Sequence, residues 1–157
     1  MNNLSYEQAL NRIATYCSRA ERCFFDVRRK LDSWEIPVNQ QNEIIKKLQK
    51  EKFLDEERFC KAFVNDKTKY NRWGIYKIRF ELKKRLIPEE LIKKALNNID
   101  TKENSELLRS LIEQKMKTVK GKNEWEIKQK LMRFVAGRGF ALNDIERILE
   151  SIPFHIK

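Results

Sequence analysis

Basic side chains are concentrated in one stretch of the chain, and aromatic side chains lie among them. The stretch Lys67–Arg85 contains eight basic residues and one acidic residue, Glu81, which gives a net charge of +7 over 19 positions. Cationic groups attract polyanions, and aromatic rings beside them can stack on nucleic-acid bases or contact another protein. This stretch therefore predicts a surface that binds a polyanionic partner.

A second basic stretch lies closer to the C-terminus. Lys115–Arg138 contains eight basic residues against Glu124 and Glu126. Over all 157 residues, 34 Lys and Arg outnumber 23 Asp and Glu, and the resulting net charge of +11 is typical of nucleic-acid-binding proteins. Two such surfaces would form an extended cationic strip, suited to a long helical polyanion or an acidic groove. The candidate binding residues are Lys69, Arg72, Trp73, Tyr76, Lys77, Lys83, Lys84, Arg85, Lys128, Lys130, Arg133 and Arg138.

Each of these signals has an ordinary structural alternative. A run of lysines is often no more than a solvated helix face. Tyr76 and Phe80 flank the expected buried stripe of their helix and can pack against neighbouring helices. Trp73 and Trp125, at the expected starts of two helices, more commonly serve packing. The sequence leaves these alternatives open.

No set of residues in the sequence predicts catalysis. The single histidine, His155, lies near the C-terminal end and offers no internal base or metal ligand. The segment 137–139 lacks the spacing and the Lys–Ser/Thr continuation of a phosphate-binding loop. Cys17, Cys23 and Cys60 form no C-x-x-C pair, which favours reduced, buried thiols in a cytoplasmic protein. We therefore expect no enzymatic activity, no metal ion and no cofactor, and the short apolar runs predict no membrane span.

The elements that position the basic residues are expected to be helices in three repeats. Gly and Pro are rare, at 4 and 3 residues, and an apolar content of 41% suffices for a core. The apolar pattern of residues 27–48, which include Pro37, recurs at an offset of 51 in 78–99, which include Pro88, and at a further offset of 53 in 131–152. We therefore expect an all-α fold of three tandem three-helix, helix-turn-helix-like repeats that form an elongated, curved molecule. The expected repeats are residues 1–54, 55–99 and 100–157.

Local signals set the expected helix boundaries. The capping patterns Ser5–Gln8 and Asp100–Glu103 and the N-cap residue Asp55 predict where the first helix of each repeat begins. Pro37 and Pro88 are expected in the first turn of the third helices. The second helices are expected over Glu21–Trp34, Asn71–Leu86 and Glu124–Ala136.

The second helix of the middle repeat carries the strongest charge. One side of its helical wheel predicts the buried face, which is formed by Ile75, Ile78, Leu82 and Leu86. Lys77 and Lys84 lie roughly opposite, so we expect both on the solvent-facing side.

Four short patterns in the chain are similar to those of one known family. They are Asp55-x-x-Arg58-Phe59-x-x-x-Phe63, Arg72-x-Gly74-x-x-x-Ile78-x-x-x-Leu82 with Ile87, Tyr16-Cys17-Ser18-Arg19-Ala20-Glu21-Arg22, and Arg138-Gly139-Phe140. Over nearly its whole length the chain resembles the RecX family of recombination regulators. Glu35 and Leu86 stand where that family commonly has glycine after a second helix, whereas Gly139 keeps it, and Cys23 replaces the usual Ser.

The resemblance implies a cytoplasmic bacterial regulator that is not an enzyme and acts as a monomer. Members of the family bind the RecA–single-stranded-DNA filament in its helical groove, across neighbouring protomers. They usually suppress ATP hydrolysis, strand exchange and co-protease activity in recombination, DNA repair and the SOS response. The implied partners are therefore RecA and the single-stranded DNA in its filament, with weak, non-specific binding to naked DNA and no membrane.

A different class of protein explains the charge and the helices equally well. A helix-turn-helix protein that binds duplex DNA directly is normally a symmetric dimer, whose recognition helix reads base edges with Arg, Asn or Gln side chains. The one cluster of this kind is Asn39–Asn42, directly after Pro37. The sequence keeps this alternative open.

Overall fold

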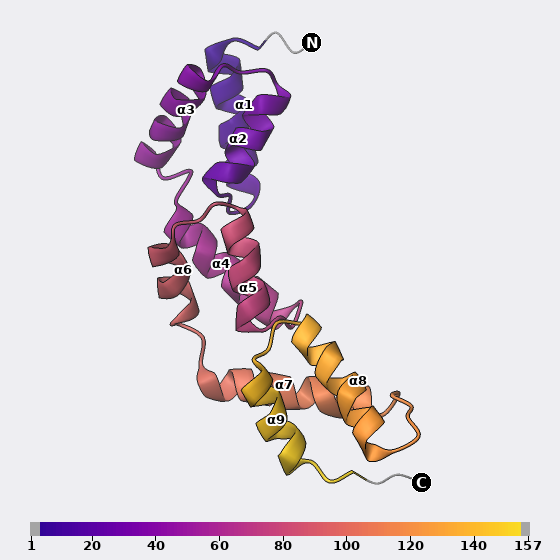
Figure 1. Cartoon of the computed structure of the whole chain (residues 1–157). Coiled ribbons are helices and arrows are strands. Elements are labelled where there is room, and N and C mark those ends of the chain that lie inside the picture. The colour runs from indigo at the N-terminus through magenta and orange to yellow at the C-terminus, as the bar shows by residue number, and fades with distance from the viewer. Residues whose placement is uncertain (1–3, 155–157) are drawn as a thin grey trace. The chain divides into compact units, whose positions relative to one another are not determined.

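The computed structural model describes residues 4–154, and this part of the chain contains nine α-helices and no strand (Figure 1). The all-α fold expected from the sequence is confirmed. The helices are α1 (Tyr6–Arg19), α2 (Phe24–Ser33), α3 (Val38–Lys50), α4 (Glu56–Lys69), α5 (Ile75–Lys84), α6 (Glu89–Leu96), α7 (Thr101–Met116), α8 (Glu124–Gly137) and α9 (Leu142–Ser151).

The described chain divides into two compact units, and the division passes through helices α4, α5 and α6. The first unit contains the chain up to Phe63 together with Leu82–Ile92. The second unit contains Val64–Glu81 together with the chain from Lys93 onwards. Each unit is described by itself below.

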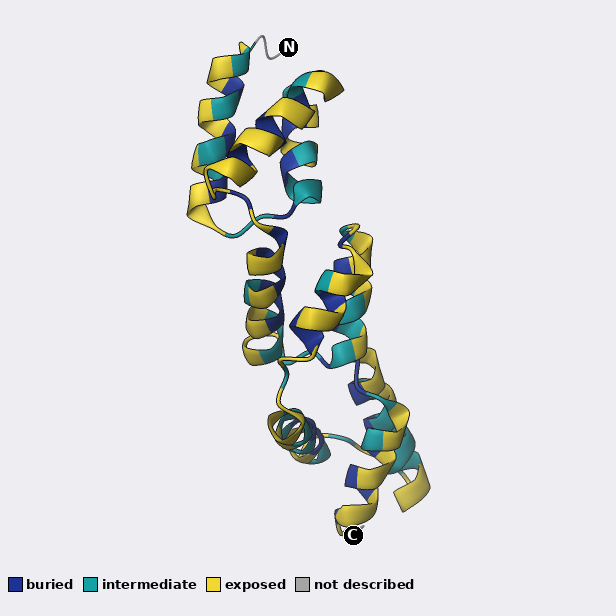
Figure 2. Ribbon diagram, turned by 90° about the vertical axis from the view of Figure 1, so that its left-hand side faces the viewer, coloured by how far each residue is buried: buried dark blue, intermediate teal, exposed yellow. Residues whose placement is uncertain are grey.

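Each unit contains an apolar core cluster to which three helices contribute. In the first unit, Ile13 of α1, Leu31 of α2 and Ile44 of α3 are fully buried. In the second, Ile112 of α7 and Ile145 of α9 are buried together with residues of α8. Figure 2 shows the buried positions as stripes along the inward faces of these helices. Burying a large aliphatic side chain contributes about 1.5–3 kcal/mol, which holds in place helices that are too short to be stable alone.

The helix boundaries repeat at the two offsets expected from the sequence. Helix α5 begins and ends at the counterparts of the first and last residues of α2, and α6 begins at the counterpart of the first residue of α3. Helix α9 begins at the counterpart of the first residue of α6. Ile78 and Leu82 are fully buried, and so are their counterparts in the third repeat, Leu131 and Val135. The predicted three-helix repeat is therefore confirmed.

The turn after each second helix has the same backbone geometry. Glu35, Leu86 and Gly139 occupy it with φ values of 57°, 58° and 98°. In all three turns, the amide of the next residue donates to the carbonyl five positions earlier, at 3.1–3.3 Å. Leu86 was expected in the buried face, and this prediction is wrong: its side chain is 77% exposed. The left-handed turn directs it away from the core, and Ile87, at 5% exposure, is buried instead.

The side-chain caps predicted for the first helix of each repeat are confirmed. Ser5 and Gln8 form a reciprocal capping box at the start of α1. The Asp55 carboxylate accepts a hydrogen bond from the Arg58 amide at 3.1 Å, and the Asp100 carboxylate caps α7 in the same way. These caps satisfy amides that have no acceptor inside the helix.

Several other boundaries differ from the prediction. Helix α2 begins at Phe24, after the expected Glu21, and Pro88 precedes α6, which begins at Glu89. Pro37 is the N-cap of α3 and therefore precedes the first turn. Helix α5 begins at Ile75, later than the expected start at Asn71, because the backbone at Arg72 is left-handed, with a φ of 55°. Gly74 is then the N-cap of α5, since its carbonyl accepts the first helical hydrogen bond, from the Ile78 amide at 3.2 Å.

Candidate partner-binding surface

Helix α5 exposes two aromatic rings on one side. Tyr76 and Phe80 are one turn apart and are 60% and 61% exposed. Further along the same helix Lys83 and Lys84 are exposed, and Lys83 makes only a loose ion pair with Glu89, at 3.9 Å. Ion pairs this exposed contribute little to stability. The surface predicted for α5 therefore has exposed aromatic and basic side chains, and more than half of the surface of Tyr76 and of Phe80 is open to solvent.

Two lysines lie against Trp73, which stands in the loop before α5. The ammonium groups of Lys67 and Lys77 lie 5.0 and 4.7 Å from the centroid of its ring, within the range of cation–π attraction. Trp73 is half-buried, as its packing alternative requires. Lys77 was expected on the open side of α5 but is only partly exposed, because its ammonium group lies over this ring.

Two exposed aromatic residues were missed as binding candidates. Tyr70, directly after α4, is 72% exposed, and the Lys69 ammonium group lies 5.4 Å from its ring centroid. Trp125, in the first turn of α8, is 70% exposed, which does not support the packing alternative for it. Both residues stand in polar surroundings outside the apolar stripe of their helices, which is the sequence signal that could have identified them.

Three of the predicted arginines make contacts within the chain. The Arg72 guanidinium donates to the Gln114 side-chain oxygen at 3.0 Å. The Arg138 guanidinium donates to the backbone oxygen of Asn71 at 3.1 Å. The guanidinium of Arg85 lies 5.0 Å from the centroid of an aromatic ring on α4. Each of these side chains therefore has a structural contact of its own.

The predicted lysines on α8 are paired with acids one turn earlier. Lys128 lies 3.0 Å from Glu124, and Lys130 lies 3.4 Å from Glu126. Arg133 is exposed on the same helix. Because the two ion pairs offset charge locally, α8 presents a weaker cationic surface than α5.

Models of known protein families identify most of this arrangement. The model for the second three-helix domain of RecX matches residues 55–96, and the model for the third three-helix domain matches residues 102–149. Together they cover more than half of the chain. The chain belongs to the RecX family.

Curated RecX proteins resemble the chain beyond these two domains. The regulatory protein RecX of Prosthecochloris aestuarii is 26% identical over 152 residues, which cover 97% of this chain and 98% of the relative. That of Caldanaerobacter subterraneus is 32% identical over 110 residues, which cover 68% of this chain and 51% of the relative. Several other RecX relatives are longer, and the match spans 48–59% of their length.

Solved RecX structures show the same fold. A crystal structure of a regulatory protein RecX matches with a TM-score of 0.85 and 23% identity, covering 92% of this chain and 73% of the other. RecX from Lactobacillus salivarius matches with a TM-score of 0.83 and 21% identity, covering 93% and 95%. The arrangement of three-helix domains described above is thus the RecX fold.

The relatives are named as regulatory proteins, which agrees with the expectation that the chain is not an enzyme.

Burial raises the pKa of the thiols of Cys17 and Cys60 to about 11 and that of Cys23 to about 12, so all three stay protonated at neutral pH. Within residues 4–154 no cluster of His, Cys, Asp and Glu could hold a metal ion, and His155 lies outside the described residues. No helix described is long and apolar enough to cross a membrane.

The cluster that favoured a duplex-reading protein has a structural role in this RecX chain. Gln41 is only 2% exposed, and its amide donates to the Asp32 carboxylate at 2.6 Å and to the Ile36 carbonyl at 2.9 Å. Asn42 accepts a hydrogen bond from Arg28 at 2.9 Å. A buried glutamine whose amide is already hydrogen-bonded cannot read a base edge, so Gln41 does not support the duplex alternative.

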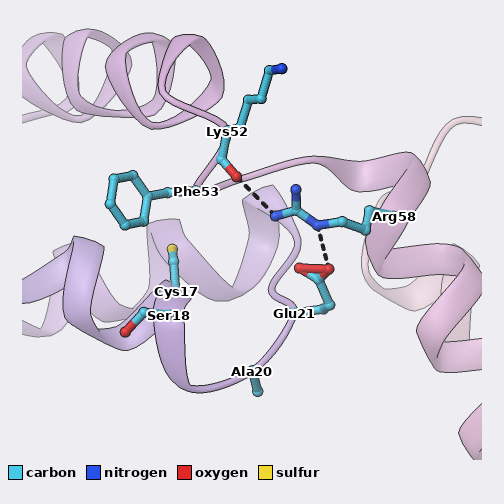
Figure 3. A pocket seen from close by; sticks show the side chains of 7 residues that line it. All are labelled: Cys17, Ser18, Ala20, Glu21, Lys52, Phe53 and Arg58. Carbon is cyan, nitrogen blue, oxygen red and sulfur yellow. Dashed lines mark hydrogen bonds and ion pairs between the residues drawn. The ribbon is translucent and has the colours of Figure 1, made fainter.

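Arg58, from the central RecX-like pattern, binds two other segments of the first unit beside an open cavity of about 470 Å³ (Figure 3). Its guanidinium donates to the Glu21 carboxylate and, at 3.1 Å, to the backbone oxygen of Lys52. Nearby on α4, the buried Glu56 carboxylate accepts a hydrogen bond from the Phe24 amide at 2.9 Å, at the start of α2. These five residues form the first junction, in which charged side chains of α4 bind the start of α2, the loop before α2 and the loop after α3.

Proposed function

We propose that this chain regulates a RecA recombinase by binding the RecA–single-stranded-DNA filament in its helical groove. Binding lowers the ATPase, strand-exchange and co-protease activities of the filament in recombination and DNA repair. The observation that carries the proposal is membership of the RecX family, whose curated members are regulatory proteins. The net charge of +11 further supports a partner that presents negative charge. The protein acts as a cytoplasmic monomer.

The contacts proposed for the filament are the exposed side chains of α5 and of the end of α4. Lys69, Lys83 and Lys84 attract acidic side chains or phosphates, while Tyr76 and Phe80 contact apolar surface or stack on bases. Each contact is weak alone, and contacts to several protomers sum through multivalency. Contacts that favour one filament geometry shift its conformational equilibrium, and thereby its ATPase activity, without touching ATP.

Steady-state ATP hydrolysis by RecA on single-stranded DNA tests the proposal. We expect hydrolysis to fall as the protein is added at substoichiometric ratios. Binding to naked DNA should be weak, sequence-tolerant and strongly salt-dependent, because most of its free energy comes from counterion release. Unchanged hydrolysis together with tight binding to one defined duplex would contradict the proposal and favour direct action on duplex DNA.

A matched pair of variants separates the proposed surface from general basicity. Lys69, Lys83 and Lys84 are replaced together by Glu in one variant, and Lys46, Lys47 and Lys50 of α3 in the other. All six lysines are exposed, and the net charge changes equally. Like charges across an interface cost several kcal/mol, so the first variant should need at least about tenfold more protein for half-maximal inhibition. Equal losses from both variants would mean that total charge matters and the surface does not; circular dichroism controls for folding.

A further inference from the structure

Helix α5 has no side-chain cap of its own. Its N-cap residue is Gly74, which carries no side chain that could accept a hydrogen bond from the first-turn amides. Helix α8, its counterpart in the next repeat, is capped in the usual way, because the Asn123 side chain accepts from the Glu126 amide at 2.9 Å. The first turn of α5 therefore depends on acceptors from elsewhere in the chain.

The turn between α8 and α9 supplies those acceptors. The Gly74 amide donates to the Arg138 carbonyl at 2.7 Å, and the Tyr76 amide donates to the Gly139 carbonyl at 3.0 Å. Both carbonyls lie at the positive end of the α5 dipole, where a partial negative charge is stabilising. The Arg138 guanidinium adds a bond to the backbone oxygen of Asn71. These five residues, all in the second unit, form the second junction.

The close approach of the two main chains requires glycine on both sides. A Cβ atom at Gly74 would lie 2.4 Å from the Gly139 carbonyl oxygen and 2.7 Å from the Phe140 nitrogen, and these backbone atoms cannot turn away. A Cβ atom at Gly139 would lie 2.5 Å from both the nitrogen and the Cβ of Lys77. Gly139 also has a φ of 98°, which other residues adopt only with strain.

We infer that Gly74 and Gly139 are positioning residues, which order the first turn of α5 and thereby set the orientation of Tyr76 and Lys77. The backbone amide of Tyr76, whose ring is exposed, donates to the Gly139 carbonyl. The Lys77 backbone lies against Gly139. The binding surface of α5 therefore forms only while the α8–α9 turn is in place. The expected effect on filament binding rests on the function proposed above, whereas the expected effect on the order of the first turn of α5 does not.

Hydrogen exchange in the unmodified protein tests the ordering directly. Tyr76 and Trp125 are both the second residue of their helices, and the described residues provide no acceptor for the Trp125 amide. We expect the Tyr76 amide to exchange at least about 100-fold more slowly than the Trp125 amide, after correction for intrinsic rates. Similar protection of the two amides would overturn the inference without any variant.

A pair of glycine variants tests the consequence for binding. Gly74→Ala should release the contact, while Gly137→Ala adds its Cβ where nothing lies within 4 Å. We expect Gly74→Ala to lose protection at the Tyr76 amide and to bind the filament at least about tenfold more weakly, and Gly137→Ala to match the unmodified protein. Full protection or full affinity in folded Gly74→Ala protein would overturn the inference.

A double-mutant cycle distinguishes positioning from a general structural role. If Gly74 acts through Tyr76, then Tyr76→Ala should weaken filament binding in the unmodified protein but have little further effect in the Gly74→Ala background. Additive losses would overturn the positioning role. A chain that does not bind the filament at all would refute the proposed function, and the exchange rates would still decide whether the glycine contact orders α5.

Discussion

The first junction holds the start of α2 and the second holds the start of α5, the corresponding helix of the next repeat, and the two are built from different chemistry. The residues that correspond to Gly74 and Gly139 one repeat earlier are Cys23 and Leu86. The first junction attaches the start of α2 through the Glu56 carboxylate and leaves an open cavity of about 430 Å³ beside it. At the second, the main chains touch directly, with a hydrogen bond as short as 2.7 Å.

The comparison shows what makes glycine necessary at one of three equivalent turns. Glu35 and Leu86 adopt the same left-handed conformation as Gly139, so positive φ alone does not demand glycine here. Gly139 differs because the backbone of Lys77 occupies the space where its Cβ would lie. The second junction should therefore respond to added volume, and the first to the loss of a hydrogen-bond acceptor.

The largest effect is expected when Gly139 of the second junction is replaced by the residue found at the equivalent turn after α5. Gly139→Leu copies Leu86 into a place where a neighbouring backbone leaves no room. Overpacking and left-handed strain together should cost about 3 kcal/mol or more in the free energy of unfolding. The control, Gly137→Leu, places the same side chain at an open position two residues earlier and should cost less than about 1 kcal/mol. Chemical denaturation measures both, and equal costs would remove the distinction between the junctions.

An intermediate effect is expected at the carboxylate of the first junction. Glu56→Ala removes the acceptor of the Phe24 amide and should cost about 1 kcal/mol, as the loss of a helix cap does. Glu56→Gln keeps an acceptor and should cost less. Denaturation of both variants at neutral pH measures the difference, and the same loss for Gln and Ala would show that the negative charge, and not the hydrogen bond, is what matters.

The pH dependence of stability sharpens this test. Burial raises the pKa of the Glu56 carboxyl above its ordinary value, so the folded state binds its proton more tightly than the unfolded chain does. The contribution of this group to stability is therefore most favourable below its ordinary pKa and declines as the pH rises through the raised folded value. Glu56→Gln should gain stability relative to the unmodified protein between about pH 4 and about pH 7. A constant difference across that range would contradict the direction of the shift.

The smallest effect is expected where the turn after α5 is made to resemble the turn after α8. Leu86→Gly removes a mostly exposed side chain and relieves left-handed strain, and the entropy of glycine offsets part of this gain. We expect a net stabilisation of about 0.5 kcal/mol, measured by thermal denaturation. Leu86→Ala loses nearly the same side chain and keeps the strain, so it should show no gain. An equal gain in both would mean that the exposed leucine, and not its backbone, is unfavourable.

Local sequence signals and periodicity were enough to predict the helices and their repeat. Ser5, Asp55 and Asp100 cap the helices predicted for them, because a cap depends on residues three or four positions apart. The burial of Ile78 and Leu131 follows from the apolar period in the same way. These features depend on residues close together in the chain, so they can be predicted from one amino-acid sequence.

The remaining differences depend on contacts between distant segments. Helix α5 begins later than predicted because the backbone at Arg72 is left-handed, and its first turn is capped from Gly139. Lys77 is partly covered because its ammonium group lies over Trp73. The arginines predicted to bind a partner, such as Arg72 with its acceptor Gln114, are engaged by segments far away in the sequence. Charge identifies a candidate binding residue, and only the fold shows which of its donors are already engaged.

Lysine acetylation of the protein, alone and bound to a RecA–single-stranded-DNA filament, tests the central proposal most directly. The measurement compares the rate at each lysine with its own rate in the free protein, so different exposures in the free state cancel. We expect acetylation of Lys69, Lys83 and Lys84 to slow several-fold in the complex, while Lys46, Lys47 and Lys50 react at unchanged rates. Slowing at the α3 lysines with no change at the other three would contradict the account, because the filament would then contact the face assigned to solvent.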